Sequence, residues 1–260
     1  MLSHFRELLR YRELLLAWTR REIKVRYKQS VLGVAWAILQ PFSMMVIFTV
    51  IFSFFVKIPT DGVPYPIFAY SALLPWTFFA SSLSFAVPSL VNNMNLVTKI
   101  YFPREIFPLA AIIASFVDFL VASVIFIGMM IFYRVPLSLT LLLVPLIVLI
   151  QIILTVGVVL FASALNVFYR DVRFVIPLGV QLWMYATPII YPLSLVPERL
   201  KPFYMLNPMV GVIDSYRKVI LSGQWPDFSS LGLAAAISVA LFLGAYWYFK
   251  NAEMEFADVI

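Results

Sequence analysis

The sequence predicts an all-α polytopic membrane protein with six transmembrane helices. Hydrophobic residues make up 63% of the 260 residues and charged residues only 12%, whereas a soluble domain averages about 45–50% and about 25%. A helix of about 20 apolar residues crosses a bilayer core of about 30 Å. The apolar stretches between the charged residues provide six such helices, so the composition excludes a soluble globular protein.

The predicted spans cover about 31–56, 66–91, 106–133, 139–168, 174–194 and 229–249. We count the fourth once because the stretch between Arg134 and Arg170 is too short for two spans and a turn. All six belong to a single transmembrane domain over residues 1–260. Six spans place both termini on one side, which then holds 13 of the 19 Lys and Arg residues. The positive-inside rule makes this side the cytoplasm.

Residues 1–30 form a predicted interface segment on the cytoplasmic side, in which Leu2 to about Ala17 is an amphipathic helix. They contain eight Lys or Arg residues against three Glu residues, with leucines at helical spacing between the arginines. The excess of positive charge suits an anionic lipid surface or a phosphate-bearing substrate, although it also suits a role in setting the topology alone. A nucleic-acid partner is not expected, because no soluble domain is present to carry it.

The segment 92–104 is predicted to form about two turns of helix in a cytoplasmic loop. Asparagines at its start favour a helix cap, and Pro103 disfavours helix at the residue before it. Leu96, Ile100 and Tyr101 would then face the cytoplasm and need a partner to cover them. The alternative is an ordinary loop whose apolar side chains contact lipid.

The outer segment between the fifth and sixth spans contains five prolines, too many for one continuous helix. Within it, Asn207 is placed to cap a helix that has Pro208 in its first turn and ends near Leu221. A helix of about 14 residues cannot cross the bilayer. We therefore expect it to lie on the outer leaflet or to dip into it.

Asp118 is the one acidic residue inside a predicted span. An intramembrane carboxylate is costly unless it is paired or hydrated, so it is a proton site, an acceptor for a hydroxylated substrate, or a bond between helices through a Ser, Thr or Tyr. We favour the structural interpretation, because no basic partner or histidine relay lies in the spans.

Aromatic residues make up 17% of the chain, more than belts at the membrane surfaces require. Because the apolar faces of sugar rings lie against aromatic rings, the aromatic residues inside the spans are candidates for a substrate path. For each of them a place in an interfacial belt is the alternative. The candidates are Trp36, Tyr70, Trp76, Trp183, Tyr185 and Tyr191.

The sequence lacks the motifs of the common catalytic sites. It has no GxxxxGK[ST] loop for nucleotide phosphates, no HExxH and no GxSxG. It has no cysteine and a single histidine, His4, so neither thiolate chemistry nor a His-rich metal site is expected. We therefore expect a transport subunit rather than an enzyme, with no metal and no cofactor in this chain.

Several short motifs resemble, in order and spacing along almost the whole chain, the permease subunits of ABC transporters that export polysaccharide. The likeness is greatest to O-antigen exporters and extends to teichoic acid and capsule exporters. The motifs are Leu32-Gly33-Val34-Ala35-Trp36 with Gln40-Pro41, the stretch from Asn95 to Glu105, Phe168-Tyr169-Arg170-Asp171, and Leu206-Asn207-Pro208 with Tyr216-Arg217.

The resemblance implies a homodimer that forms one channel in the bacterial inner (plasma) membrane. Two copies of a separate nucleotide-binding subunit, which holds ATP and magnesium, would drive it. The segment 92–104 would be a coupling helix docking on that subunit, beside an N-terminal interface helix. Its contact residues would be Asn95, Leu96, Lys99, Ile100, Tyr101 and Phe102.

The resemblance also implies gate helices over residues 195–222 at the exit of the channel. The residues there that match are Asn207, Pro208, Tyr216 and Arg217. In this family the substrate is a polysaccharide on undecaprenyl pyrophosphate. We assign Arg6, Arg10 and Arg12 as contacts for the pyrophosphate or for membrane lipid, because they are basic and lie near the cytoplasmic entrance.

Three other functions stay open from the sequence. An ABC permease for small amphipathic molecules would share the same architecture. An ion-coupled secondary transporter or lipid flippase would show paired intramembrane charges and internal repeats. A polytopic glycosyltransferase would show a cluster of carboxylates near the interface, whereas the acidic residues of this chain are scattered.

Overall fold

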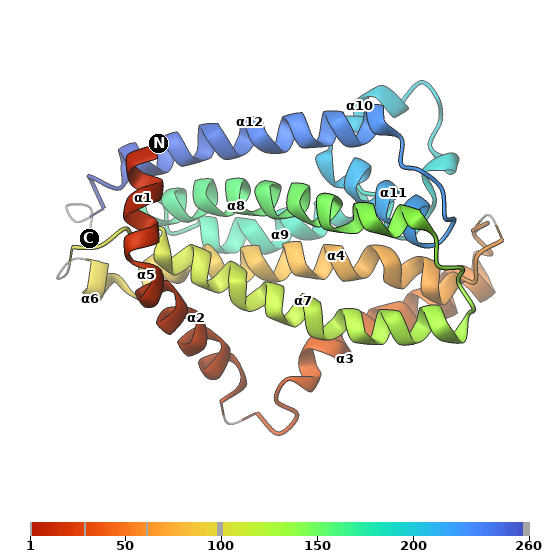
Figure 1. Ribbon diagram of the computed structural model, residues 1–260, viewed down its shortest axis with the longest axis horizontal. Helices are drawn as coiled ribbons and strands as arrows, with labels where there is room; N and C mark the ends of the chain where they lie inside the picture. Colours follow the sequence, from red (N-terminus) through yellow and green to blue (C-terminus); the bar gives the residue numbers. More distant parts are fainter. Residues whose placement is uncertain (1, 29, 61, 98–100, 257–260) are drawn as a thin grey trace.

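The computed structural model describes residues 2–28, 30–60, 62–97 and 101–256, and within these ranges all the regular secondary structure is helical. Figure 1 shows a bundle of long helices running side by side, with short helices gathered at its two ends. One end carries α1 (Leu2–Arg10), α5 (Ser89–Asn92) and α6 (Met94–Val97), and we call it the α1 end. The opposite, α11 end carries α10 (Lys201–Met205) and α11 (Pro208–Ile220).

Five helices in the described ranges are long and apolar enough to cross a membrane. They lie where the first, second, third, fourth and sixth spans are predicted. Two of them begin or end with a different helical turn: α3 continues as a π-helix, η1, and α8 follows a 3₁₀ turn, η2. Their bounds are α3–η1 (Ala35–Phe48, Thr49–Phe55), α4 (Tyr65–Ala86), α7 (Ile106–Phe132), η2–α8 (Leu139–Leu143, Val144–Phe168) and α12 (Phe228–Ala252).

The predicted fifth span contains a shorter helix than expected. The helix there, α9 (Val172–Tyr185), has 14 residues. The prediction of a helix that continues to residue 194 is therefore wrong. Pro188 has no N–H to donate and disfavours helix at the residue before it, so the chain continues as turns to a short 3₁₀ helix, η3 (Leu193–Leu195). The count of six spans stays a prediction.

The long helices differ greatly in how far the bundle encloses them. In α4, 78% of the most apolar stretch is buried, whereas in α3 the buried share is 11%. Helix α4 is therefore the centre of the bundle, and α3 lies at its edge. The exposed apolar side of α3 is left for lipid or for a partner.

The predicted interface segment consists of two helices, α1 and α2 (Arg12–Tyr27), with a turn at Tyr11. Helix α1 crosses the end of the bundle (Figure 1). Helix α2 packs against α7, with the ring of Trp18 at 4.8 Å from that of Phe107. The second half of the segment therefore follows the side of the bundle instead of lying wholly at its end.

The helix predicted to begin at Asn207 is confirmed as α11. The Asn207 side chain accepts a hydrogen bond from the backbone N–H of Met209 at 3.1 Å, which caps the helix. Most of α11 is buried, and it packs against α4, α8 and α12. It is therefore enclosed by the long helices rather than resting on a leaflet.

Helices α8 and α12 pack closely at Gly157. A Cβ atom at this position would lie 2.9 Å from the backbone Cα and N atoms of Phe242, which is too short for any side chain. The close packing of the two helices thus depends on a residue without a side chain.

We predict that Gly157→Ala lowers the melting temperature of the purified protein, because the added methyl group forces α8 and α12 apart at a cost of about 1–3 kcal/mol. The matched control is Gly244→Ala, where a Cβ atom meets nothing within 4 Å. It should be neutral or slightly stabilising, since Ala is the better helix former. Equal melting temperatures for the two variants would contradict this packing argument.

Candidate substrate path and coupling segment

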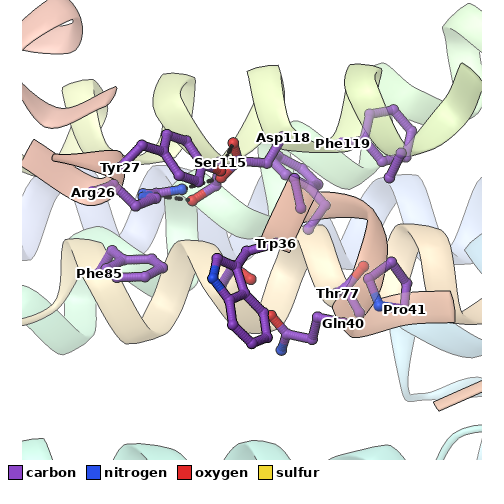
Figure 2. A pocket seen from close by; sticks show the side chains of 14 residues that line it. Arg26, Tyr27, Trp36, Gln40, Pro41, Thr77, Phe85, Ser115, Asp118 and Phe119 are labelled. Atoms are coloured by element: carbon purple, nitrogen blue, oxygen red, sulfur yellow. Dashed lines mark hydrogen bonds and ion pairs between the residues drawn. The ribbon is translucent and has the colours of Figure 1, made fainter. Parts of the chain in front are cut away.

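A cleft opens at the side of the bundle where α2, α3, α4 and α7 meet. Its wall combines rings with polar groups, which is typical of sites that bind polar organic molecules. Figure 2 shows Trp36 and Gln40 of α3 beside this cleft. The lining side chains include Arg26, Tyr27, Trp36, Gln40, Thr77, Phe78, Ser81, Phe85, Ser115, Asp118 and Phe119.

Asp118 is held by two residues from the end of α2. The Tyr27 hydroxyl donates to its Oδ1 at 2.5 Å, and Arg26 forms an ion pair with its Oδ2. Arg26 also donates to the Ser115 hydroxyl at 3.3 Å, and its guanidinium lies 3.9 Å from the centre of the Phe85 ring. Figure 2 shows these groups pointing toward one another.

Asp118 has a basic partner in Arg26, which lies outside the spans to which the expectation applied. Its partner comes from outside the spans, because α2 folds back along α7 and brings Arg26 to the middle of that helix. The carboxylate therefore bonds one helix to another, as the structural interpretation predicts. Two features of the sequence point to this pair. Asp118 is the lone acid within the spans, and Arg26 is a basic residue shortly before the first span.

The six aromatic residues predicted for the path differ in exposure. Trp36 and Tyr185 are 53% and 55% exposed, and Trp183 and Tyr191 are half-buried. Tyr70 and Trp76 are buried, at 0% and 3%, because both belong to the enclosed helix α4. Their rings pack on Phe126 and Phe79, so neither presents a surface to a substrate within this protomer.

Asn207 ties the end of α9 to the start of α11. Besides capping α11, its Oδ1 accepts from the indole Nε1 of Trp183 at 2.9 Å. Its amide donates to the Ala186 carbonyl at 3.2 Å and to the Thr187 hydroxyl at 2.9 Å. A residue predicted for the gate and an aromatic residue predicted for the path therefore meet directly.

Arg217 is buried at the α11 end and fixes the turns that follow α9. Its guanidinium donates to the carbonyls of Pro188 at 2.5 Å, Ile189 at 2.6 Å and Tyr191 at 3.2 Å. It lies 3.6 Å from the centre of the Phe68 ring. Three carbonyl oxygens thus replace water around a charge that the bundle encloses.

The other two residues of the predicted gate, Pro208 and Tyr216, are also buried in α11. Pro208 opens α11, and the Tyr216 hydroxyl donates to Gln151 of α8 at 3.2 Å. The amide of Gln151 donates in turn to the carbonyl of Pro75 in α4 at 2.6 Å. The matching residues of the outer segment are therefore joined to the central helices.

The predicted coupling segment has one exposed and one buried aromatic residue. Tyr101 is 86% exposed, whereas Phe102 is 9% exposed and packs on Phe107 at 5.4 Å. Asn95 is exposed and Leu96 half-buried in α6. Lys99 and Ile100 lie outside the described residues. Among the described residues of the segment, α6 forms one turn of helix.

The chain just after this segment is joined to the end of α12 by ion pairs that the sequence does not reveal. Lys250 Nζ lies 2.7 Å from Glu105 Oε2 and 2.8 Å from Glu253 Oε2. The backbone N–H of Arg104 donates to Glu253 Oε1 at 3.0 Å. Burial raises the pKa of the Glu105 carboxyl, and the ammonium of Lys250 opposes this.

The basic residues assigned to an anionic ligand are accessible. Arg6, Arg10 and Arg12 are exposed on α1 and at the start of α2. They lie at the end of the bundle that also carries α5 and α6 (Figure 1). Among the described residues, no group of three or more His, Cys, Asp or Glu side chains is placed to hold a metal ion.

Long apolar helices, with a polar and aromatic cleft at the side of the bundle and charges paired inside it, define the class of multi-pass membrane proteins. Comparison with known families narrows this class. The model of the ABC-2 type transporter family matches residues 13–221, and the chain belongs to this family. It is therefore a permease, a transport component rather than an enzyme, and the ion-coupled transporter and glycosyltransferase alternatives are set aside.

Curated relatives align over nearly the whole chain. The O-antigen export system permease protein RfbA of Myxococcus xanthus is 31% identical over 100% of both chains. The protein of the same name from Klebsiella pneumoniae is 29% identical over 95% of both. The polysialic acid transport protein KpsM of Escherichia coli is 25% identical over 90% of this chain and 91% of its own.

We predict that Asp118→Asn destabilises the protein, because Arg26 then lies among apolar groups without its counter-ion. Loss of a hydrogen bond to a charged group costs about 1.5–3 kcal/mol. The double variant Arg26→Met with Asp118→Asn should recover part of this loss, since it leaves no unpaired charge. The measurement is the melting temperature of each variant.

A different result would identify a direct role for Asp118. If Asp118→Asn keeps the wild-type melting temperature and assembly but abolishes transport, the carboxylate acts on a substrate or a proton, and the structural interpretation is wrong.

Proposed function

We propose that this chain is the channel-forming permease of an ATP-driven exporter that moves lipid-linked polysaccharide of the O-antigen type across the bacterial inner membrane. The observation that carries the proposal is the alignment over the full length of an O-antigen export permease. Both termini lie in the cytoplasm in this proposal. The chain itself binds no cofactor, and ATP and magnesium belong to a partner subunit.

The partner is a nucleotide-binding subunit, present in two copies, that docks on the α1 end. Asn95, within α6, and Tyr101, four residues after its end, support this part of the proposal, because both are exposed. Lys99 and Ile100 complete the docking segment. Leu96 and Phe102 serve a different purpose, since they pack against the chain's own aromatic cluster and hold the segment in place.

The channel forms between two copies of this chain. The exposed side of α3 and the rings of Trp36 and Tyr185 would face it, with Trp183 and Tyr191 nearer its outer end. An exposed aromatic ring offers a flat apolar surface to a sugar, and the polar groups of the cleft offer hydrogen bonds to its hydroxyls. Asn207, Pro208, Tyr216 and Arg217 fix the outer turns that shape the exit.

The lipid carrier enters from the cytoplasmic side. Arg6, Arg10 and Arg12 are exposed and would contact its diphosphate or the anionic lipid around it. A neighbouring reading frame that encodes a Walker-type ATPase which copurifies with this chain would support the whole arrangement.

We predict that Tyr101→Asp abolishes copurification with the ATPase subunit, because a carboxylate at an apolar contact pays its desolvation cost without a partner. Trp225→Asp is the matched control, since Trp225 is also exposed, at 61%, and precedes α12 at the opposite end. Copurification that survives Tyr101→Asp, with normal export, would refute the docking proposal.

We predict that Trp36→Ala reduces polysaccharide export without loss of ATPase association, whereas Trp36→Phe keeps most of the activity because it retains a ring. Trp247→Ala is the control, as Trp247 is 66% exposed on α12 outside the cleft. The readout is surface polysaccharide per amount of protein in the membrane. Export of small amphipathic molecules with unchanged surface polysaccharide would favour the alternative ABC permease function.

A further inference from the structure

The stretch that leads from the coupling segment into α7 is bound to the end of α12 by both side chains and backbone. Arg104 donates its backbone N–H to the Glu253 carboxylate at 3.0 Å and its guanidinium to the Glu253 carbonyl oxygen. Lys250 bridges Glu253 and Glu105, at 2.8 Å and 2.7 Å. We call Arg104, Glu105, Lys250 and Glu253 the α7–α12 clamp.

The clamp is largely buried. The side chain of Glu105 is 1% exposed, that of Lys250 13% and that of Glu253 18%. The guanidinium of Arg104 lies 5.9 Å from the ring centre of Phe256, a fully buried ring that packs on α12 and on the end of α8. Arg104, Lys250 and Glu253 also line a small pocket at this end of the bundle, so Glu105 is the member of the clamp that is fully withdrawn from solvent.

Two positive and two negative groups make the clamp neutral as a whole. A buried group of this kind adds little net stability compared with apolar side chains of the same size, because desolvation offsets the attraction. Its directed bonds instead fix the position of one segment relative to the other. The clamp is therefore better suited to holding a geometry than to supplying free energy of folding.

The far end of α12 is in contact with the outer turns through α11. A Cβ atom at Gly211 of α11 would lie 2.8 Å from the backbone oxygen of Ser230 in α12. Arg217, on the same helix α11, donates to the carbonyls of Pro188, Ile189 and Tyr191. A continuous series of close contacts thus runs from the coupling segment, along α12, to the turns at the α11 end.

We propose that the α7–α12 clamp transmits displacement of the coupling segment to α12, and through α12 to the outer turns, so that its four residues are positioning residues for coupled transport. This inference rests on the proposed function. It assigns a role to the end of α12, which lies outside the docking segment. Rigid helices joined by packed and hydrogen-bonded contacts can carry such coupling over the length of a bundle.

The test compares Lys250→Met and Glu253→Gln with the wild-type complex of permease and ATPase in lipid vesicles. Three quantities are measured: association of the subunits, the rate of ATP hydrolysis, and the polysaccharide moved per ATP hydrolysed. We expect association and hydrolysis to persist, while transport per ATP falls about tenfold. The conservative variant Lys250→Arg should keep most of the transport, because a guanidinium can donate to both Glu105 and Glu253.

The matched control removes an ion pair at the opposite end. Glu198→Gln breaks the contact of Lys201 Nζ with Glu198 Oε1 at 2.5 Å, where Glu198 is 85% exposed, and should leave transport per ATP unchanged. Glu253→Gln is the milder of the two clamp variants, since an amide keeps the size and the acceptor of the carboxylate. It therefore provides a folded variant if Lys250→Met does not assemble.

Unchanged transport per ATP in Glu253→Gln would overturn the inference, as would parallel losses of association, hydrolysis and transport that leave their ratio constant. Failure of the wild-type chain to associate with the ATPase contradicts the proposed function instead. The two failures are therefore distinguishable.

Discussion

Polar side chains enclosed among apolar helices need partners inside the protein, and this requirement organises the molecule from one end to the other. Asp118 draws α2 against α7 through Arg26 and Tyr27. Arg217 gathers the carbonyls after α9 around its guanidinium. Each contact joins segments far apart in the sequence. Apolar packing alone would let the same helices slide, because lipid contacts an apolar surface as well as another helix does.

Much of the helical architecture follows from the sequence, since a long apolar stretch between charges has few alternatives to a helix in lipid. The cap at Asn207 was equally predictable, because a side-chain acceptor before a proline is a local signal. The end of α9 at Tyr185 was not predicted, although Pro188 is a local signal for it, because the apolar composition continues past this proline. The partner of Asp118 was missed, since the pairing depends on the direction α2 takes.

The candidate site was less predictable than the fold. Trp36 and Tyr70 are both aromatic residues within apolar stretches, yet one is exposed and the other enclosed. What separates them is the place of their helices in the bundle, at the edge for α3 and at the centre for α4. A single sequence carries no such information. The same limit applies to the α7–α12 clamp, in which Arg104 and Glu253 lie 149 residues apart in the chain.

The loose attachment of α3 also bears on how the protein is made. During synthesis α3 enters the membrane before α4 and α7 exist, and it gains little burial when they arrive, with 11% of its apolar stretch enclosed. Arg26 emerges from the ribosome early but finds its counter-ion only after α7 has inserted. Helices α2 and α3 are therefore translated before the helices they pack against and reach their final positions only after those have inserted, so that chaperones or proteases would meet them in the interval.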